Sequence, residues 1–200
     1  MECIIGLRCK NFAIVAADCR VGMSILTFKH TEDKIYELSK NVVMGICGES
    51  GDTTNFAEYI QQNMQLYEIR NGYQLTPNAA ANFTRKNMAN ALRSRHPYHV
   101  NMVVAGFDKN TGASVHYIDY LACHVEVPYA IHGYGGHFAL TVLDKGYKED
   151  MTLDQAMTLL KEAICEIHKR LAINMDRFSF KYVDENGIHK LPDFIIPTAA

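Results

Sequence analysis

The sequence predicts an α+β protein, a four-layer αββα sandwich of two antiparallel sheets flanked by helices. Two observations predict this fold. Short apolar segments joined by tight turns come in pairs, as in antiparallel hairpins. Paired helical segments separate the groups of strands, so that the chain runs strands, helices, strands, helices, strands. Because 48% of the 200 residues are hydrophobic and no linker or repeat divides the sequence, one domain over residues 1–200 is expected.

The predicted strands are runs of about four to eight mainly apolar residues bounded by turn residues. They are expected at residues 3–7, 12–17, 35–38, 42–47, 100–107, 114–119, 124–131, 178–183 and 188–191. Short polar turns join most of them in pairs, and Asn186–Gly187 before the last strand is typical of a tight hairpin. Hairpin pairing of this kind makes the sheets antiparallel.

Apolar residues with helical spacing predict two pairs of helices. The helices are expected at residues 52–71, 76–96, 136–145 and 152–171. Thr76 and Pro77 are typical of a helix start, because proline lacks only an N–H that has no partner there. Thr152 and Gln155 match a capping box, in which each side chain bonds the backbone of the other.

Composition argues against several classes of protein. The net charge is −2 with acids and bases interspersed, whereas nucleic-acid binding needs a basic face. Six cysteines are scattered without a Cys-x-x-Cys pair, and no signal peptide is expected. No apolar run approaches the roughly 20 residues that span a bilayer. The sequence therefore favours a reducing cytoplasmic or nuclear setting without a membrane or nucleic-acid partner.

Several polar segments look like parts of known sites, but a simpler interpretation fits each better. Ser50, in Gly48–Gly51, lacks the spacing of a nucleophile elbow and is more simply a turn or cap residue. The glycines of residues 133–136 lack the spacing of a phosphate loop. The histidine pairs 96/99 and 132/137 have no neighbouring cysteines or carboxylates, so neither a metal nor a cofactor is expected. The acidic pairs 32/33 and 149/150 are interpreted as loop charges.

Asp18 and Lys34 form the remaining candidate pair. Asp18 ends the second predicted strand and Lys34 begins the third. By themselves, a buried aspartate and a neighbouring lysine indicate no more than a structural ion pair.

Three segments together are similar to one family. VAADCR (15–20), DKIYELS (33–39) and MGICGESGD (44–52) resemble the strand-end aspartate, the lysine-bearing strand and the glycine turn of proteasome beta-type subunits. The resemblance extends over essentially the whole chain and implies the N-terminal-nucleophile hydrolase fold. Residues 56–101 are most similar to a non-catalytic position of the family's beta ring.

The resemblance implies that part of a catalytic site is retained. Active members use an N-terminal threonine as nucleophile and its own amino group as base, with a lysine held by an aspartate and a backbone amide for the oxyanion. Asp18, Lys34 and Gly48 occupy the aspartate, lysine and oxyanion-amide positions.

Other catalytic positions are lost. Counting back from Asp18, the nucleophile position falls on Glu2, which cannot attack and adds a second carboxylate near Asp18. The remaining losses are Tyr134 and Asn174 at two serine positions and Leu171 at an aspartate position. Cys3 lies one residue out of register, so its side chain is expected on the opposite face of the strand, away from Lys34.

The resemblance implies a non-catalytic structural subunit of the 20S proteasome core, which serves ATP- and ubiquitin-dependent protein degradation in the cytoplasm and nucleus. Its partners would be beta subunits of the same ring, beta subunits of the opposite ring, and alpha-ring subunits. Contacts are expected on the first two helices and residues 22–31. Two alternatives remain: an active peptidase, which needs an N-terminal nucleophile in register, and a free-standing binding protein with an apolar pocket.

Overall fold

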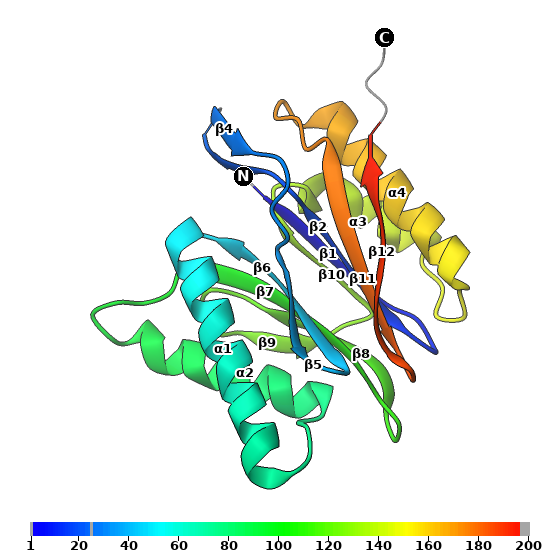
Figure 1. Cartoon of the computed structure of the whole chain (residues 1–200). Helices are drawn as coiled ribbons and strands as arrows, with labels where there is room; N and C mark the ends of the chain where they lie inside the picture. The colour runs from blue at the N-terminus through cyan, green and yellow to red at the C-terminus, as the bar shows by residue number, and fades with distance from the viewer. Residues whose placement is uncertain (1, 25, 197–200) are drawn as a thin grey trace.

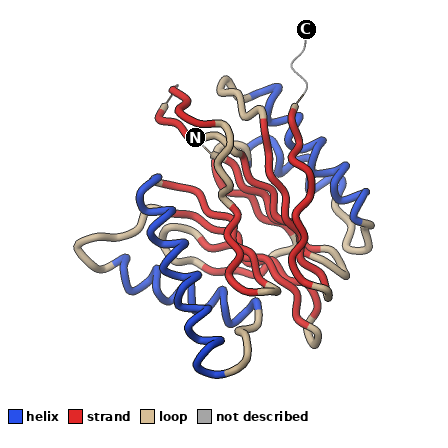
Figure 2. Tube along the Cα trace, viewed as in Figure 1, coloured by secondary structure: helices blue, strands red, loops and turns tan. Residues whose placement is uncertain are grey.

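The computed structural model describes residues 2–24 and 26–196. Two five-stranded antiparallel sheets lie face to face, and helices cover the outer face of each (Figure 1; Figure 2). This arrangement confirms the predicted four-layer sandwich.

The first sheet contains the two ends of the described chain. Its strands follow the order β10-β1-β2-β11-β12. These are β1 (Cys3–Arg8), β2 (Ala13–Asp18), β10 (Tyr129–Gly133), β11 (Arg177–Asp184) and β12 (Gly187–Ile195). The register pairs Ile4 with Ala17 between β1 and β2, and Cys3 with Gly133 between β1 and β10. The start of β1 therefore lies at the same edge as the end of β2.

The second sheet follows the order β5-β6-β7-β8-β9. Its strands are β5 (Ile35–Ser39), β6 (Val42–Gly48), β7 (Val100–Asp108), β8 (Gly112–Ile118) and β9 (His124–Glu126). A separate two-stranded hairpin, β3 (Val21–Met23) and β4 (Leu26–Lys29), leads from β2 toward β5. Figure 1 shows this hairpin projecting beyond the sandwich.

Two helices cover each sheet. They are α1 (Ser50–Asn71), α2 (Pro77–Leu92), α3 (Gly136–Gly146) and α4 (Leu153–Arg170). The helices α1 and α2 cover the second sheet, whereas α3 and α4 cover the first (Figure 1). Thr76 caps α2, and Thr152 and Gln155 form the predicted capping box of α4. Among the described residues, no helix is both long and apolar enough to cross a membrane.

Alternation along the central strands separates three apolar layers. In β1, Cys3 and Ile5 face α3 and α4, while Ile4 faces the second sheet. Strand β2 is buried throughout because one of its faces is covered by helices and the other by a sheet. Strands buried on both faces read as continuous apolar runs, which explains the VAADCR and MGICG segments.

Two strand predictions need correction. Residues 124–131 were expected to form one strand, but β9 pairs with β8 while β10 pairs with β1 in the other sheet. Pro128 lies in the crossing between them, where it cannot donate to a ladder. The β3–β4 hairpin was not predicted, because β4 is only four residues long and is exposed along its whole length, so that its alternating Leu-Thr-Phe-Lys sequence marks no buried face.

The helix predictions differ in their boundaries and faces. Helix α2 ends at Leu92 rather than near His96. On α1, Tyr59 has helical spacing with Phe56 but is 46% exposed, whereas Ala57 is buried beside Phe56. Helical spacing alone does not reveal which aromatic side chains the core buries.

Candidate functional site

The Lys34 ammonium group lies at the centre of a buried polar cluster at the edge where β1 begins and β2 ends. It donates to Asp18 Oδ2 at 2.9 Å and to the Arg20 carbonyl oxygen at 2.7 Å. Its third acceptor is Glu2 Oε1, at 2.8 Å. An ammonium group has three protons, so the hydrogen-bonding capacity of Lys34 is filled.

Asp18 is held from several sides. Its side chain is fully buried and accepts from the Cys3 amide at 2.7 Å through Oδ1 and from the Arg20 amide at 3.1 Å through Oδ2. Together with the Lys34 ammonium group, these donors compensate the buried carboxylate. The predicted Asp18–Lys34 pair is therefore formed, and it joins β2 to the start of β5.

Glu2 has a larger part in the site than the sequence indicated. While Oε1 pairs with Lys34, Oε2 accepts from the Gly48 amide at 2.7 Å. The Glu2 carboxylate thus bridges the Lys34 ammonium group and the Gly48 amide. The sequence predicted a second carboxylate near Asp18, but not that Lys34 would lie between the two acids.

Two glycines shape this edge. Gly48 has φ 146°, and a Cβ there would lie 2.2 Å from the His99 carbonyl oxygen. Gly133 has φ 88°, and a Cβ there would lie 1.9 Å from the Glu2 carbonyl oxygen. Side chains rarely adopt such backbone angles, so glycine permits both turns and lets the strand ends approach.

The charge state of Lys34 follows from its two acidic partners. Burial by itself lowers the pKa of the ammonium group, but Asp18 and Glu2 raise it by more, so that the pKa of Lys34 lies above its ordinary value. Lys34 is therefore a cation at neutral pH. It acts as a hydrogen-bond donor and counter-ion and has no lone pair with which to accept a proton.

Cys3 lies where its sequence position predicted. Its side chain belongs to the apolar layer against α3 and α4, on the opposite face of β1 from Lys34. Burial, with the Asp18 charge, raises the pKa of the thiol well above its ordinary value. Cys3 is thus a neutral, buried thiol, which is a poor nucleophile.

The remaining predicted positions make no side-chain hydrogen bond to the Lys34 cluster in the part of the chain that the structure describes. Tyr134 follows Gly133 and is 56% exposed. Leu171 caps α4 and packs against the apolar layer of the first sheet, while Asn174 is exposed in the following loop. Ser50 is the first residue of α1, and Glu49 is the N-cap. Among the described residues, no side-chain hydrogen bond links these four to Glu2, Asp18 or Lys34.

A cavity of about 230 Å³ opens beside the cluster. Its lining includes Glu2, Lys34, Gly48, Tyr36 and Ser50. Glu2 and both of the residues that its carboxylate contacts therefore line this cavity.

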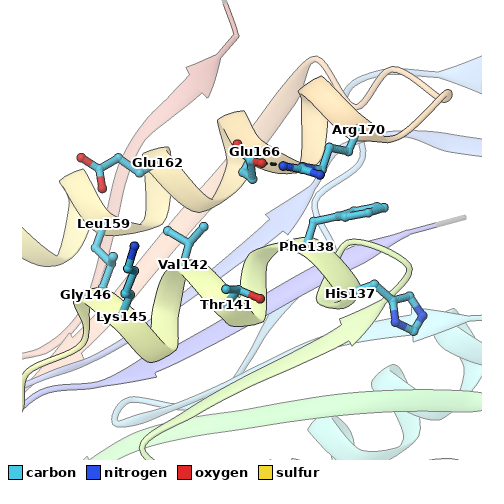
Figure 3. A pocket seen from close by; sticks show the side chains of 10 residues that line it. All are labelled: His137, Phe138, Thr141, Val142, Lys145, Gly146, Leu159, Glu162, Glu166 and Arg170. Atoms are coloured by element: carbon cyan, nitrogen blue, oxygen red, sulfur yellow. Dashed lines mark hydrogen bonds and ion pairs between the residues drawn. The ribbon is translucent and has the colours of Figure 1, made fainter.

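A larger groove of about 690 Å³ lies between α3 and α4, far along the chain from the Lys34 cluster. Figure 3 shows Thr141 and Lys145 on α3 opposite Glu162 and Glu166 on α4, with the Glu166–Arg170 ion pair along one wall. Among the described residues, the Thr141 hydroxyl of this groove makes no hydrogen bond with His137 or with a carboxylate, so the groove shows no activated nucleophile.

His132 and His137 lie in different surroundings. His132 is buried and makes a 3.0 Å hydrogen bond with the Met102 carbonyl oxygen, whereas His137 is exposed on α3. Within residues 2–24 and 26–196, no group of three histidine, cysteine or acidic residues is placed to hold a metal.

Two buried histidines predict loss of stability in mild acid. Burial lowers the pKa of His132 to about 4, and burial with the neighbouring His124 lowers that of His116 to about 4. The unfolded chain, with ordinary pKa values near 6.5, binds more protons between these limits, so stability is complete above pH ~6.5 and falls toward pH ~4. Urea unfolding should show a loss of about 1 kcal/mol per histidine between pH ~7.5 and pH ~5.5.

The variant His132→Gln provides the control for this pH dependence. Glutamine can still donate to the Met102 carbonyl oxygen but does not titrate. The variant should therefore lose stability less steeply than the parent over the same range. Equal slopes for the two proteins would contradict the assignment to His132.

The four-layer sandwich and the Asp18–Lys34–Gly48 arrangement at the start of β1 define the class of N-terminal-nucleophile hydrolase folds. Comparison with known proteins gives the family. The model of the family described as "Proteasome subunit" matches residues 1–183. The chain belongs to the proteasome subunit family.

Curated relatives match over nearly the full chain. Proteasome subunit beta type-2-B of Arabidopsis thaliana is 46% identical over 187 residues, which is 94% of each chain. Proteasome subunit beta type-4 of Saccharomyces cerevisiae is 40% identical over 195 residues, covering 97% of this chain and 98% of its own. The probable proteasome subunit beta type-4 of Schizosaccharomyces pombe is 41% identical over 192 residues, covering 96% of this chain and 99% of its own. The names beta type-2 and beta type-4 confirm the predicted resemblance to proteasome beta-type subunits.

Proposed function

We propose that the chain is a non-catalytic structural subunit of the 20S proteasome core. It would complete a beta ring between neighbouring beta subunits, contact the opposite beta ring and an alpha ring, and thereby support adjacent threonine-protease subunits. The complex would serve ATP- and ubiquitin-dependent protein degradation in the cytoplasm and nucleus. The free state of all six cysteines, which lie in the described part of the chain, agrees with a reducing compartment.

The Glu2 carboxylate is the observation that carries the non-catalytic proposal. It stands at the nucleophile position, and its two oxygens engage Lys34 and Gly48. A peptide carbonyl would need the same amide for its developing charge. A carboxylate is neither a hydroxyl nor a thiol, so the site lacks an attacking group. Its oxyanion donor, the Gly48 amide, is already bonded to Glu2.

The alternative of a cysteine peptidase has little support. The Cys3 side chain is buried against α3 and α4, and the Cys3 amide is already bonded to Asp18. Attack by Cys3 through the cavity beside Lys34 would require β1 to shift register by one residue, which moves every side chain to the opposite face.

Exposed apolar side chains support assembly with other chains. Leu26 and Phe28 on β4 are 55% and 67% exposed, and Ile69 on α1 is 80% exposed. Both elements lie within the predicted contact regions, which are the first two helices and residues 22–31. Apolar residues gathered on projecting elements are typical of surfaces that a partner covers.

The experiment that tests the proposal is isolation of the complex from the protein's own cells, followed by native and denaturing mass spectrometry. We expect a large hetero-oligomer in which this chain keeps Glu2. An electrophilic peptide that labels N-terminal nucleophiles should modify neighbouring subunits but not this chain. A monomer near 22.6 kDa, or a labelled chain trimmed to Cys3, would overturn the proposal.

The variant Phe28→Ser tests the assembly surface. Since Phe28 is 67% exposed and lies outside the three apolar layers, its loss should change the stability of the chain by less than about 0.5 kcal/mol. Incorporation into the complex, measured by pull-down against the parent chain in the same cells, should fall. Unchanged incorporation would remove β4 from the proposed interface.

A further inference from the structure

The two donors that Glu2 contacts are held in place by other parts of the chain. Lys34 Nζ is anchored by Asp18 and by the Arg20 carbonyl oxygen. Gly48 pairs with Val100 in the β6–β7 ladder, and the Glu49 amide bonds the His99 carbonyl oxygen. Neither anchor involves the Glu2 side chain. Removing that side chain therefore leaves Lys34 Nζ and the Gly48 amide pointing toward the position that the Glu2 carboxylate occupied.

The chemistry of this point suits a carboxylate. Glu2 Oε1 lies 2.8 Å from Lys34 Nζ, and Oε2 lies 2.7 Å from the Gly48 amide, so one carboxylate satisfies a cation and a neutral donor together. Lys34 is 6% exposed, which limits competition from water for its third proton. Charge-assisted hydrogen bonds of this kind are roughly twice as strong as neutral ones.

The position is also reachable from outside. The Glu2 side chain is 23% exposed, and it lines the cavity of about 230 Å³ next to Lys34 and Gly48. Truncation of glutamate to alanine removes a CH2–COO⁻ fragment, which has the size and charge of acetate. A small monocarboxylate could enter through this cavity and occupy the place of that fragment.

We infer that Lys34 Nζ and the Gly48 amide form a carboxylate-binding site, that Glu2 occupies it as an internal ligand, and that the site binds free acetate or formate when the Glu2 side chain is removed. The ligand class follows from the pair of donors. The inference does not depend on the proposed role in the proteasome, since the full chain could bind carboxylate whether or not it assembles.

The test compares the full-length parent with Glu2→Ala in sodium acetate and in sodium chloride at the same pH and ionic strength, about 0.2 M, so that screening is equal. The variant should unfold at a lower temperature than the parent in chloride. Acetate should raise the unfolding temperature of the variant until the effect saturates with concentration. The unfolding temperature of the parent should be the same in both salts. Glu166→Ala, which removes a carboxylate that is 26% exposed and forms an ion pair with Arg170, is the matched control and should respond equally to both salts.

Hydrogen exchange of glycine amides gives a second readout that requires no unfolding. Gly51 lies in the first turn of α1, where amides have no partner within the helix, and serves as the internal reference. In the parent, the Gly48 amide should exchange at least about tenfold more slowly than that of Gly51. In Glu2→Ala it should exchange as fast as Gly51, and acetate should slow it again.

If Glu2→Ala does not fold, Glu2→Gln keeps the inference testable. The side-chain oxygen of the glutamine can still accept from the Gly48 backbone amide, so hydrogen exchange of Gly48 should stay slow. Acetate should not slow it further, because the position remains filled. Rapid exchange of Gly48 in the parent would overturn the internal-ligand assignment. Equal effects of acetate and chloride on folded Glu2→Ala would overturn the carboxylate site.

Discussion

Replacing Lys34 with methionine is expected to destabilise the chain by about 3–5 kcal/mol, because it leaves buried acids without their counter-ion. Methionine matches the length of the lysine stem and fills most of its volume, so packing changes little. The Asp18 carboxylate, fully buried, and the Glu2 carboxylate would then face each other across an apolar side chain. Both would have to take up protons or draw in water, and β2 would lose its link to the start of β5.

The loss is measured by urea unfolding of the full chain, with Lys29→Met as the control. Lys29 also pairs with an acid, Glu32, but its side chain is 53% exposed. Solvent screens such a pair, so Lys29→Met should unfold at nearly the same urea concentration as the parent. Equal losses in the two variants would mean that the Lys34 ion pair contributes no more than an exposed one.

A double variant separates charge from packing. Adding Glu2→Gln to Lys34→Met removes one of the two acids that lack a counter-ion, so the double variant should be more stable than Lys34→Met alone. The coupling energy between two contacting residues, which is the difference between the loss in the double variant and the sum of the two single losses, is typically about 0.5–3 kcal/mol. We expect it to be stabilising here. Losses that simply add would show that Glu2 does not sense the charge of Lys34.

Local signals in the sequence predicted most of the fold. Thr152 and Gln155 form a capping box because both partners lie within one turn, and Gly72 ends α1 in the left-handed conformation for the same kind of local reason. The division of residues 124–131 between two sheets was missed. It depends on which distant strands are free to pair, and the only local sign was Pro128.

The candidate site was predictable in its membership but not in its contacts. Asp18 and Lys34 could be matched by position, and the structure joins them at 2.9 Å. The bridge from Glu2 to Gly48 spans 46 residues and needs both a particular glutamate rotamer and the register of β1 against β10. Neither is encoded by local spacing. The pairing of Cys3 with Gly133 fixes the register, and the Lys34 charge selects the rotamer.

Replacing Gly48 with alanine is expected to destabilise the chain by about 3 kcal/mol, through strain and steric overlap together. Gly48 has φ 146°, which alanine rarely adopts, and its new Cβ would lie 2.2 Å from the His99 carbonyl oxygen and 2.8 Å from Val100 Cα. Both contacts are with backbone of the neighbouring strand, so no flexible side chain can move aside. Relief of the overlap would turn the Gly48 amide away from Glu2 and loosen the last ladder position of β6 against β7.

Gly51→Ala is the matched control, three residues away in the same turn. No atom lies within 4 Å of a Cβ built there, and its backbone is helical. Alanine should therefore be neutral or stabilise α1 by up to about 1 kcal/mol, since it restricts the unfolded chain. Urea unfolding of both variants, with the Gly48-region amides followed by hydrogen exchange, distinguishes the causes. A large loss at residue 48 with none at residue 51 ties the geometry of this turn to the stability of the Glu2–Lys34 cluster, whereas equal small effects would mean that the turn can relax without cost.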